Sequence, residues 1–220
     1  MLVDESREML AERMIEQQVR AWDVLDERVL QVLRRVQRDG FVSAEHRYLA
    51  FADVEVPLPQ GQSMLRPNVV GRLLQSLELT GTERVLEIGS GSGYVTACLA
   101  ASAASVVSLE IFPELAELAR ANLAGMGFGN AEVSVADAMQ TEPAGRFDAI
   151  AVTGSLPLYD ERFERLLTNG GRLFVVVGEP PIMDARLVRR AADGSWSHES
   201  LFETVIDPLL NARRRPEFEF

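Results

Sequence analysis

The sequence contains no lysine, so all 22 of its basic residues are arginines. Acidic residues number 33, which leaves a formal net charge of −11 at neutral pH. Binding to nucleic acid depends on a basic surface that neutralises phosphates and releases counterions. We therefore expect no nucleic-acid partner for this chain.

Cysteine is scarce, and membrane signals are missing. The single cysteine, Cys98, excludes a disulfide within the chain, and its alanine- and leucine-rich surroundings predict a buried thiol. No apolar run reaches the length of a membrane span, and the sequence does not open with a basic segment followed by an apolar one. We expect a cytoplasmic protein with no membrane partner and no bound metal.

Length and composition fit a folded globular protein. The chain has 220 residues, of which 47% are hydrophobic and 25% are charged. This is enough for one domain with an added elaboration. We expect a helical and loop-containing lobe over residues 1–80, an α/β domain over residues 81–212, and a frayed tail over residues 213–220.

Hydrophobic periodicity predicts helices first and then an alternation of strands and helices. Two helices are expected between residues 4 and 36, joined at residues 22–23 with Asp26 as a cap. After irregular structure over residues 41–59, a third helix begins at Pro67. The expected strands cover residues 84–88, 106–109, 131–135, 149–152 and 173–177, the helices between them cover 93–101, 113–126 and 158–167, and a hairpin follows over 187–192 and 199–205.

This order of elements predicts an α/β fold with a doubly wound, mostly parallel, seven-stranded sheet. Alternating strands and helices of this length place the parallel strands inside, covered on both faces. The late hairpin adds an antiparallel edge. We expect the N-terminal helices to pack over the side of the sheet where a cofactor binds.

Residues 84–93, with the sequence RVLEIGSGSG, predict a strand that runs into a glycine-rich turn and then a helix. Such a unit opens nucleotide-binding α/β folds. The spacing is not G-x-G-x-x-G, and no G-K-[ST] phosphate loop is present. Glu87 closes the strand instead, and a carboxylate there repels a pyrophosphate and attracts a cation. The pattern resembles the first motif of methyltransferases that use S-adenosylmethionine (AdoMet). The alternative is a tight turn that binds no ligand.

Acidic residues also stand where the next two predicted strands end. Ligands of open parallel sheets bind at the carboxyl ends of the strands, so these residues are expected to share one site. Glu110 can accept two hydrogen bonds from a ribose diol, and Asp137 can accept one from an adenine amino group. The alternative is that both acids are solvated loop residues. The candidate cofactor-binding residues are Glu87, Gly89, Ser90, Gly91, Ser92, Gly93, Glu110, Ile111, Asp137 and Ala138, of which Ile111 and Ala138 offer apolar faces to an adenine ring.

Further stretches narrow the resemblance to one family. The chain resembles the protein-L-isoaspartate O-methyltransferases over residues 14–209. The matching stretches are MIEQQVR (14–20), VLDERVL (24–30), GFV (40–42), PLP (57–59), GQ (61–62), the glycine loop (89–93), GGRL (170–173) and DPL (207–209). The resemblance implies a Rossmann-like methyltransferase fold with an N-terminal helical lobe, and AdoMet as cofactor. It also implies an isoaspartyl-containing protein or peptide as partner, whose side carboxylate is methylated at the start of its repair.

Loop 61–68 departs from the pattern of that family. The family reads G-Q-T-I-S-x-P-[HY] where this chain reads GQSMLRPN, so Leu65 replaces the serine associated with the active site. Ser63 keeps a hydroxyl in the same loop and is the candidate catalytic residue. The sequence also has ADA at residues 136–138 for the family's G-D-G, and TGSLP at residues 153–157 for a run of alanines before proline.

Three interpretations therefore stay open. The protein is an isoaspartyl methyltransferase with a shifted site, a methyltransferase for another small acceptor, or an AdoMet-binding protein without catalysis. A missing catalytic histidine does not exclude the first two, because a carboxylate acceptor is already ionised at neutral pH and needs only position and desolvation. His46 and His198 lie outside the predicted strand-end loops and are expected to be surface or structural residues.

Overall fold

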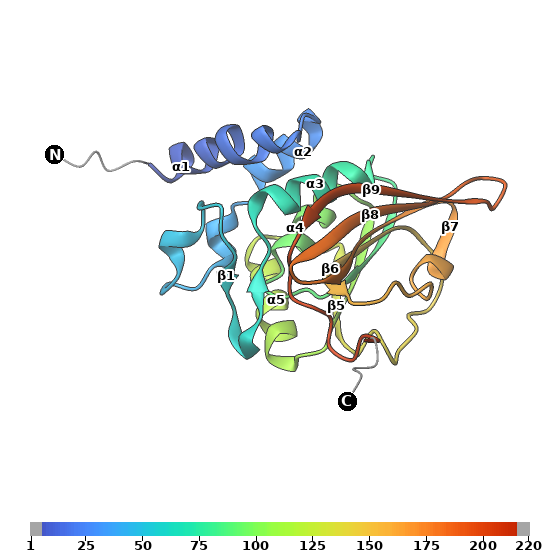
Figure 1. The fold of residues 1–220 in the computed structure, drawn as a ribbon. Helices are drawn as coiled ribbons and strands as arrows, with labels where there is room; N and C mark the ends of the chain where they lie inside the picture. Colours follow the sequence, from blue (N-terminus) through green and yellow to red (C-terminus); the bar gives the residue numbers. More distant parts are fainter. Residues whose placement is uncertain (1–5, 215–220) are drawn as a thin grey trace.

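The computed structural model describes residues 6–214 and shows a central sheet beside a helical N-terminal part (Figure 1). The strands of the sheet are β3 (Arg84–Ile88), β4 (Ser105–Glu110), β5 (Ala131–Val135), β6 (Phe147–Leu156), β7 (Leu167–Glu179), β8 (Ile182–Arg190) and β9 (Trp196–Thr204). All the predicted strands are present, and most are longer than predicted. The predicted start of the first helix at residue 4, and the predicted tail beyond residue 214, lie outside the described residues.

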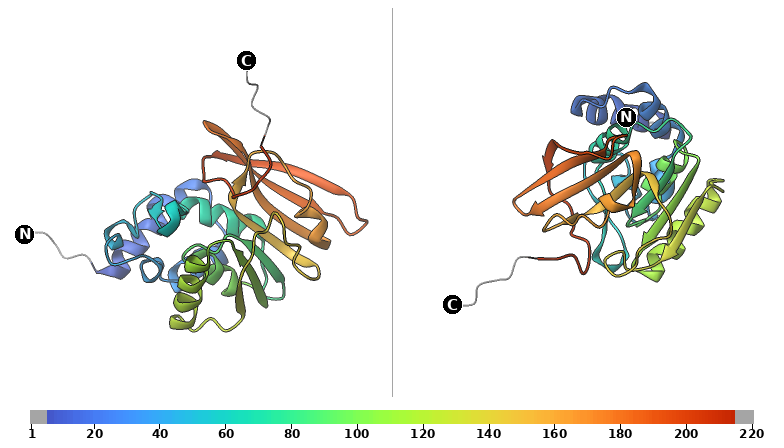
Figure 2. Two further views of the ribbon diagram at one scale, coloured as in Figure 1. Left: turned by 90° about the horizontal axis from the view of Figure 1, so that it is seen from below. Right: turned by 90° about the vertical axis from the view of Figure 1, so that its right-hand side faces the viewer.

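The seven strands form one sheet in the order β5-β4-β3-β6-β7-β8-β9. Neighbours from β5 to β7 are parallel, whereas the pairs β7–β8 and β8–β9 are antiparallel. The chain moves outward from β3 to β5 and then returns to β6 on the other side of β3, so β3 and β6 flank a topological switch point. The predicted mostly parallel sheet with an antiparallel edge is confirmed. The β8–β9 hairpin forms the edge of the sheet opposite β5 (Figure 2), and Phe202 of β9 contacts Trp22 of the N-terminal part.

Three helices cover one face of the sheet. They are α3 (Pro67–Leu77), α4 (Tyr94–Ala100) and α5 (Pro113–Gly125), and they pack against one another in that order. Pro67 and Pro113 begin their helices, as predicted, at positions where the missing N–H leaves no hydrogen bond unmade. The helical layer places the start of α4 directly after the glycine loop.

The opposite face is covered by turns, with no α-helix among the described residues. Its core joins strand side chains such as Ile150 with Met139 and Phe163 from connecting segments. The helix predicted over residues 158–167 is wrong, because this segment forms turns and a single 3-10 turn at Glu164–Leu166. Leu167 pairs with Phe147 as part of β7, so sheet pairing ends the segment before a helix can extend.

The N-terminal part contains α1 (Arg7–Met14), which continues through a π-helical turn (Ile15–Val19), and α2 (Glu27–Arg35). The π-helical turn and α2 pack against α3. Asp26 caps α2, as predicted, by accepting a hydrogen bond from the Arg28 amide at 2.9 Å. Residues 41–59, which were expected to be irregular, contain short 3-10 turns. An unpredicted strand pair begins in this segment with β1 (Val56–Pro57) and is completed beyond it by β2 (Ser63–Met64).

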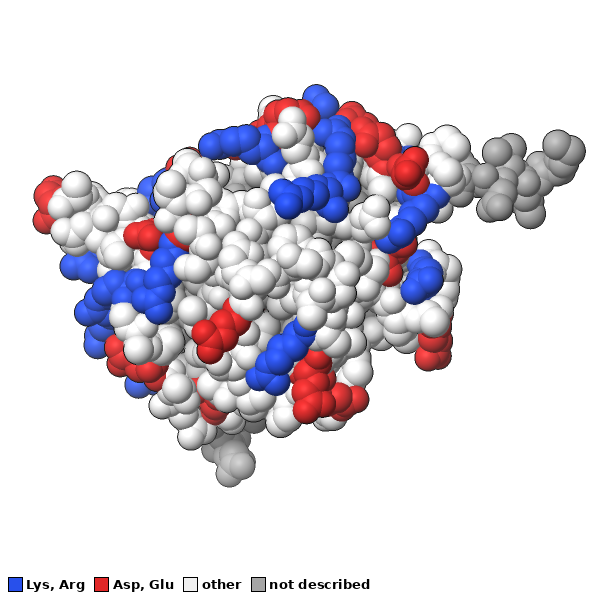
Figure 3. Space-filling model, turned by 180° about the vertical axis from the view of Figure 1, so that it is seen from behind, with Lys and Arg blue, Asp and Glu red and all other residues white. Residues whose placement is uncertain are grey.

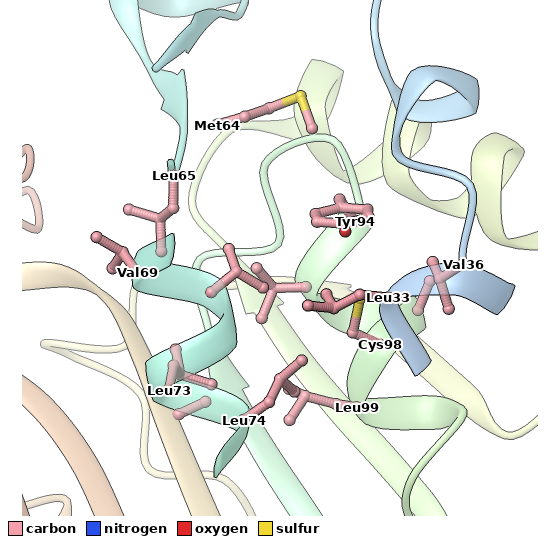
Figure 4. Close-up of a cluster of buried hydrophobic side chains, with 14 of the residues drawn as sticks. Leu33, Val36, Met64, Leu65, Val69, Leu73, Leu74, Tyr94, Cys98 and Leu99 are labelled. Atoms are coloured by element: carbon pink, nitrogen blue, oxygen red, sulfur yellow. The ribbon is translucent and has the colours of Figure 1, made fainter. Parts of the chain in front are cut away.

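One hydrophobic core connects the N-terminal part to the helical face of the sheet. Figure 4 shows Leu33 and Val36 from the region of α2 near Cys98 and Leu99 of α4, and all four belong to the same buried cluster. Cys98 is fully buried, and burial raises the pKa of its thiol to about 12. The prediction of a buried thiol is confirmed.

The composition argues against membrane and nucleic-acid partners. No helix within residues 6–214 has the length and apolar character that crossing a membrane requires. On the face drawn in Figure 3, arginines and acidic residues form small separate groups around an uncharged centre. This face therefore presents no continuous basic surface of the kind that binds nucleic acid.

Candidate active site

A cavity opens where β3, β4, β5 and β6 end, at the switch point of the sheet. The loop after β3 forms one wall, the segments after β4 and β5 form a second, and residues 55–65 with residues 206–210 form a third. All the predicted cofactor-binding residues except Glu87 and Gly93 line this cavity, and so does Ser63. The structure thus brings the predicted cofactor residues and the predicted catalytic residue into one space.

Two glycines of the loop lie close to side chains of neighbouring segments, where a Cβ would leave little space. Gly89 has φ +92°, and a Cβ there would lie 2.6 Å from the hydroxyl oxygen of Thr153. Gly91 has φ +50°, and a Cβ there would lie 3.2 Å from a methyl carbon of Leu58. The Thr153 hydroxyl lies 2.8 and 2.7 Å from the carbonyl oxygens of Ile88 and Gly89, so it ties the ends of β3 and β6 together.

Gly93 lies at the contact between the start of α4 and α5. It does not line the cavity, and its φ is +84°. A Cβ at this position would lie 3.1 Å from Cα and 3.2 Å from the carbonyl oxygen of Ala119 in α5. Gly93 therefore permits the close approach of α5 to the start of α4, and its assignment as a cofactor-binding residue stays a prediction.

Glu87 is also not a wall residue. Its side chain is fully buried behind the glycine loop and accepts hydrogen bonds from Thr96 Oγ1 at 2.5 Å and Ser108 Oγ at 2.6 Å. Burial raises the pKa of Glu87 to about 7, with a further contribution from the nearby Glu110 carboxylate, although the two hydroxyls oppose the shift. Glu87 thus joins β3 to α4 and β4, and its assignment as a cofactor-binding residue stays a prediction.

Glu110 occupies the cavity wall at the end of β4. One carboxylate oxygen accepts a hydrogen bond from the Gly91 amide at 2.9 Å and a longer one from the Ser90 hydroxyl at 3.4 Å. The other accepts one from the Phe112 amide at 3.1 Å. A carboxylate accepts about four hydrogen bonds, so Glu110 fixes the glycine loop and still has accepting capacity toward the cavity.

Asp137 lies in the segment after β5. One carboxylate oxygen accepts from the Met139 amide at 2.8 Å, and the other from the side chains of Gln140 at 2.7 Å and Asn211 at 2.8 Å. Asn211 comes from the C-terminal segment and was not predicted. Arg162 donates to the carbonyl oxygens of Met139 and Ala138, so the segment around Asp137 is held from two directions.

The third wall is built from residues 55–65 and residues 206–210. Ser63 in β2 lines the cavity, and Leu65 lines it as well while remaining 8% exposed. Figure 4 shows Leu65 above Val69 at the start of α3, in the main hydrophobic cluster. Helices α1 and α2 contribute no lining residue, so the expectation that they cover the cofactor side is corrected: residues 55–65 do so instead.

The cavity contains more acidic groups than were predicted. Glu55 and Asp207 also line it, at the end formed by the third wall. Burial raises the pKa of Glu55, the Asp207 carboxylate adds to this, and Arg66, whose Nε lies 3.9 Å from Glu55, opposes it. An acidic cavity favours a cationic ligand. His46 and His198 are not among the lining residues.

The chain matches the family model described as protein-L-isoaspartate(D-aspartate) O-methyltransferase over residues 8–213. The chain belongs to this family. A protein-L-isoaspartate O-methyltransferase of Koribacter versatilis is 36% identical over 199 residues, which are 90% of this chain and 89% of that protein. One from Methanoculleus marisnigri is 41% identical over 181 residues, which are 81% of this chain and 82% of that protein.

Solved structures of two proteins from the family share the fold. The Plasmodium falciparum protein-L-isoaspartate O-methyltransferase, crystallised with S-adenosyl-L-homocysteine, superposes with a TM-score of 0.79 at 20% identity and covers 94% of this chain and 99% of its own. A second protein-L-isoaspartate O-methyltransferase superposes with a TM-score of 0.76 at 22% identity, and the match covers 92% of this chain and 65% of that one. Membership of the family makes this protein an AdoMet-dependent methyltransferase.

Proposed function

We propose that this protein transfers a methyl group from AdoMet to the side carboxylate of an isoaspartyl residue in a protein or peptide. The observation that carries the proposal is that one cavity joins the glycine loop and Glu110 to Ser63 and its neighbours Gln62, Met64 and Leu65. A cofactor and an acceptor can therefore meet within it. Family membership over residues 8–213 supports the same acceptor.

The residues of the cavity fit AdoMet. Glu110 has accepting capacity left for ribose hydroxyls, and Asp137 has one oxygen that accepts only the Met139 amide. Ile111 and Ala138 offer apolar contacts for an adenine ring, and Gly89 and Gly91 leave space beside the backbone. We assign cofactor binding to these residues together with Ser90 and Ser92.

The chemistry asks little of the protein beyond position and the exclusion of water. AdoMet supplies a methyl group on a positively charged sulfur. An isoaspartyl carboxylate is already ionised at neutral pH, so no general base is needed. We assign Ser63 a hydrogen bond to the acceptor, which orients a carboxylate oxygen. Met64 and Leu65 beside it add apolar side chains to this wall of the cavity.

Leu65 supports a second candidate acceptor. Its side chain can neither donate nor accept a hydrogen bond, so the cavity has one polar partner fewer at the position of the family's serine. A less polar small molecule that carries a carboxylate or hydroxyl would suit this wall better than a peptide. On this alternative, isoaspartyl methylation is weak while AdoMet binding is retained.

The test is methyl transfer from labelled AdoMet to an isoaspartyl peptide, with the normal aspartyl peptide as the matched control. The proposal predicts a labelled methyl ester on the isoaspartyl peptide alone. Equal labelling of both peptides, or of neither, refutes it. If neither is labelled although the protein binds S-adenosyl-L-homocysteine, the small-molecule acceptor is favoured. A cytoplasmic location belongs to the same proposal, and detection of the protein in fractionated cells tests it.

A further inference from the structure

Arg38 is a charged residue inside the hydrophobic core. Its residue exposure is 1%, and it stands at the start of the 3-10 turn Arg38–Phe41. Among the described residues no carboxylate lies within ion-pair distance of it, and the neighbouring Asp39 pairs with Arg7 instead. Arginine stays protonated in proteins, so the core contains an unpaired positive charge. Burying such a charge is costly, and its hydrogen bonds must offset that cost.

The contacts of Arg38 join three segments that are distant in the sequence. Its Nε donates to the carbonyl oxygen of Ala50 at 3.0 Å, and its Nη2 donates to the carbonyl oxygen of Leu65 at 2.8 Å. Its guanidinium carbon lies 4.9 Å from the centre of the Tyr94 ring. Leu65 and Tyr94 both line the cavity, one from loop 61–68 and the other from the start of α4. Arg38 itself does not line it.

We propose that Arg38 is a positioning residue for methyl transfer. It donates to the carbonyl oxygen of Leu65 and contacts the Tyr94 ring, and it thereby sets the distance between loop 61–68 and the start of α4. The acceptor enters the cavity between these two parts. The planar guanidinium suits this work because its donors point in fixed directions toward two carbonyl oxygens while its face stacks on an aromatic ring. A lysine at this position keeps the charge but reaches the two carbonyls less well. The expected effect on the acceptor rests on the proposed function.

A residue that merely stabilises the fold would give a different result, and Arg72 provides the matched control. Its guanidinium carbon lies 5.0 Å from the centre of the Phe202 ring. It donates to the carbonyl oxygens of Trp22 at 3.1 Å and Leu201 at 3.2 Å. Arg72 therefore makes the same three kinds of contact as Arg38, together with an ion pair to Asp23 at 3.9 Å, and it does not line the cavity.

The experiment compares Arg38→Met, Arg38→Lys and Arg72→Met at a temperature where each is folded. We measure kcat/KM for an isoaspartyl peptide, affinity for S-adenosyl-L-homocysteine by calorimetry, and hydrogen exchange of the peptide that spans loop 61–68. Arg38→Met should lower kcat/KM roughly tenfold or more through misplacement of the acceptor. Its loop should exchange faster, and its affinity for S-adenosyl-L-homocysteine should match that of the wild type. Arg38→Lys should recover part of the loss, and Arg72→Met should leave kcat/KM and loop exchange unchanged.

Two results would overturn the proposal: equal loss of kcat/KM in Arg38→Met and Arg72→Met, or unchanged loop exchange in the Arg38 variants. If Arg38→Met does not fold, hydrogen exchange of loop 61–68 in Arg38→Lys decides whether Arg38 positions this loop. If the wild type methylates no isoaspartyl peptide, the proposed function fails, and loop exchange alone still decides whether Arg38 positions loop 61–68.

Discussion

Replacing Glu110 should weaken cofactor binding by a predictable amount. Its carboxylate is the acceptor assigned to the ribose hydroxyls, and hydrogen bonds to a charged group contribute about 1.5–3 kcal/mol. Losing that contribution in Glu110→Ala should weaken binding of S-adenosyl-L-homocysteine by about 10- to 150-fold. Titration calorimetry with the purified variant measures this directly.

The same substitution also disturbs the glycine loop, and the two effects must be separated. Glu110→Ala leaves the amides of Gly91 and Phe112 without their acceptor, which costs about 1–3 kcal/mol of folding stability for each one that stays dry. Glu110→Gln keeps one acceptor oxygen and the side-chain volume, so it should bind more weakly than the wild type but less weakly than Glu110→Ala. The exposed Glu199 supplies the control variant Glu199→Ala. Wild-type affinity in Glu110→Ala would refute the assignment.

Three further predictions follow from the site and its support. Leu65→Ser should raise isoaspartyl methylation without changing the affinity for S-adenosyl-L-homocysteine, as measured by radiolabel transfer; no gain would mean that the leucine only packs. Glu87 has its pKa raised to about 7 in the folded state, so its contribution to stability is complete below about pH 4.5 and is lost as the pH rises toward 7. Glu87→Gln should therefore lose less thermal stability than the wild type between pH 5 and pH 8, and parallel melting profiles would contradict this. Gly93→Ala should lower the free energy of unfolding by about 2 kcal/mol or more, through backbone strain and a clash with α5. The control Gly194→Ala, at φ +85° with nothing within 4 Å of the added Cβ, should lose only the part due to strain. Equal losses of the two variants in urea unfolding would show that the clash contributes nothing.

Local patterns were enough to predict the strands and the glycine loop. The apolar run of β3 and the residues at the strand ends follow from periodicity and from the rule that such ends share one edge. The same rule correctly brought Glu110 and Asp137 together in one cavity. It could not distinguish the two faces of a strand, so Glu87 was assigned to the cavity.

The alternation of side chains along β3 explains why Glu87 does not line the cavity. Side chains two apart on a strand share a face, so Glu87 points with Val85 toward α4, where it meets Thr96, while Ile88 lines the cavity. The helix predicted over residues 158–167 failed for a non-local reason, because pairing with Phe147 draws Leu167 into the sheet. Asn211 and Glu55 lie at the site because the fold brings distant segments together. No motif in the neighbouring sequence predicts either position.

The most direct test of the account is a structure of the protein with S-adenosyl-L-homocysteine and an isoaspartyl peptide. We predict ribose hydroxyls within hydrogen-bonding distance of Glu110, and the isoaspartyl carboxylate between Ser63 and the cofactor sulfur. A nucleoside bound away from Glu110, or a peptide carboxylate outside the cavity formed by loop 61–68 and residues 206–210, would contradict it.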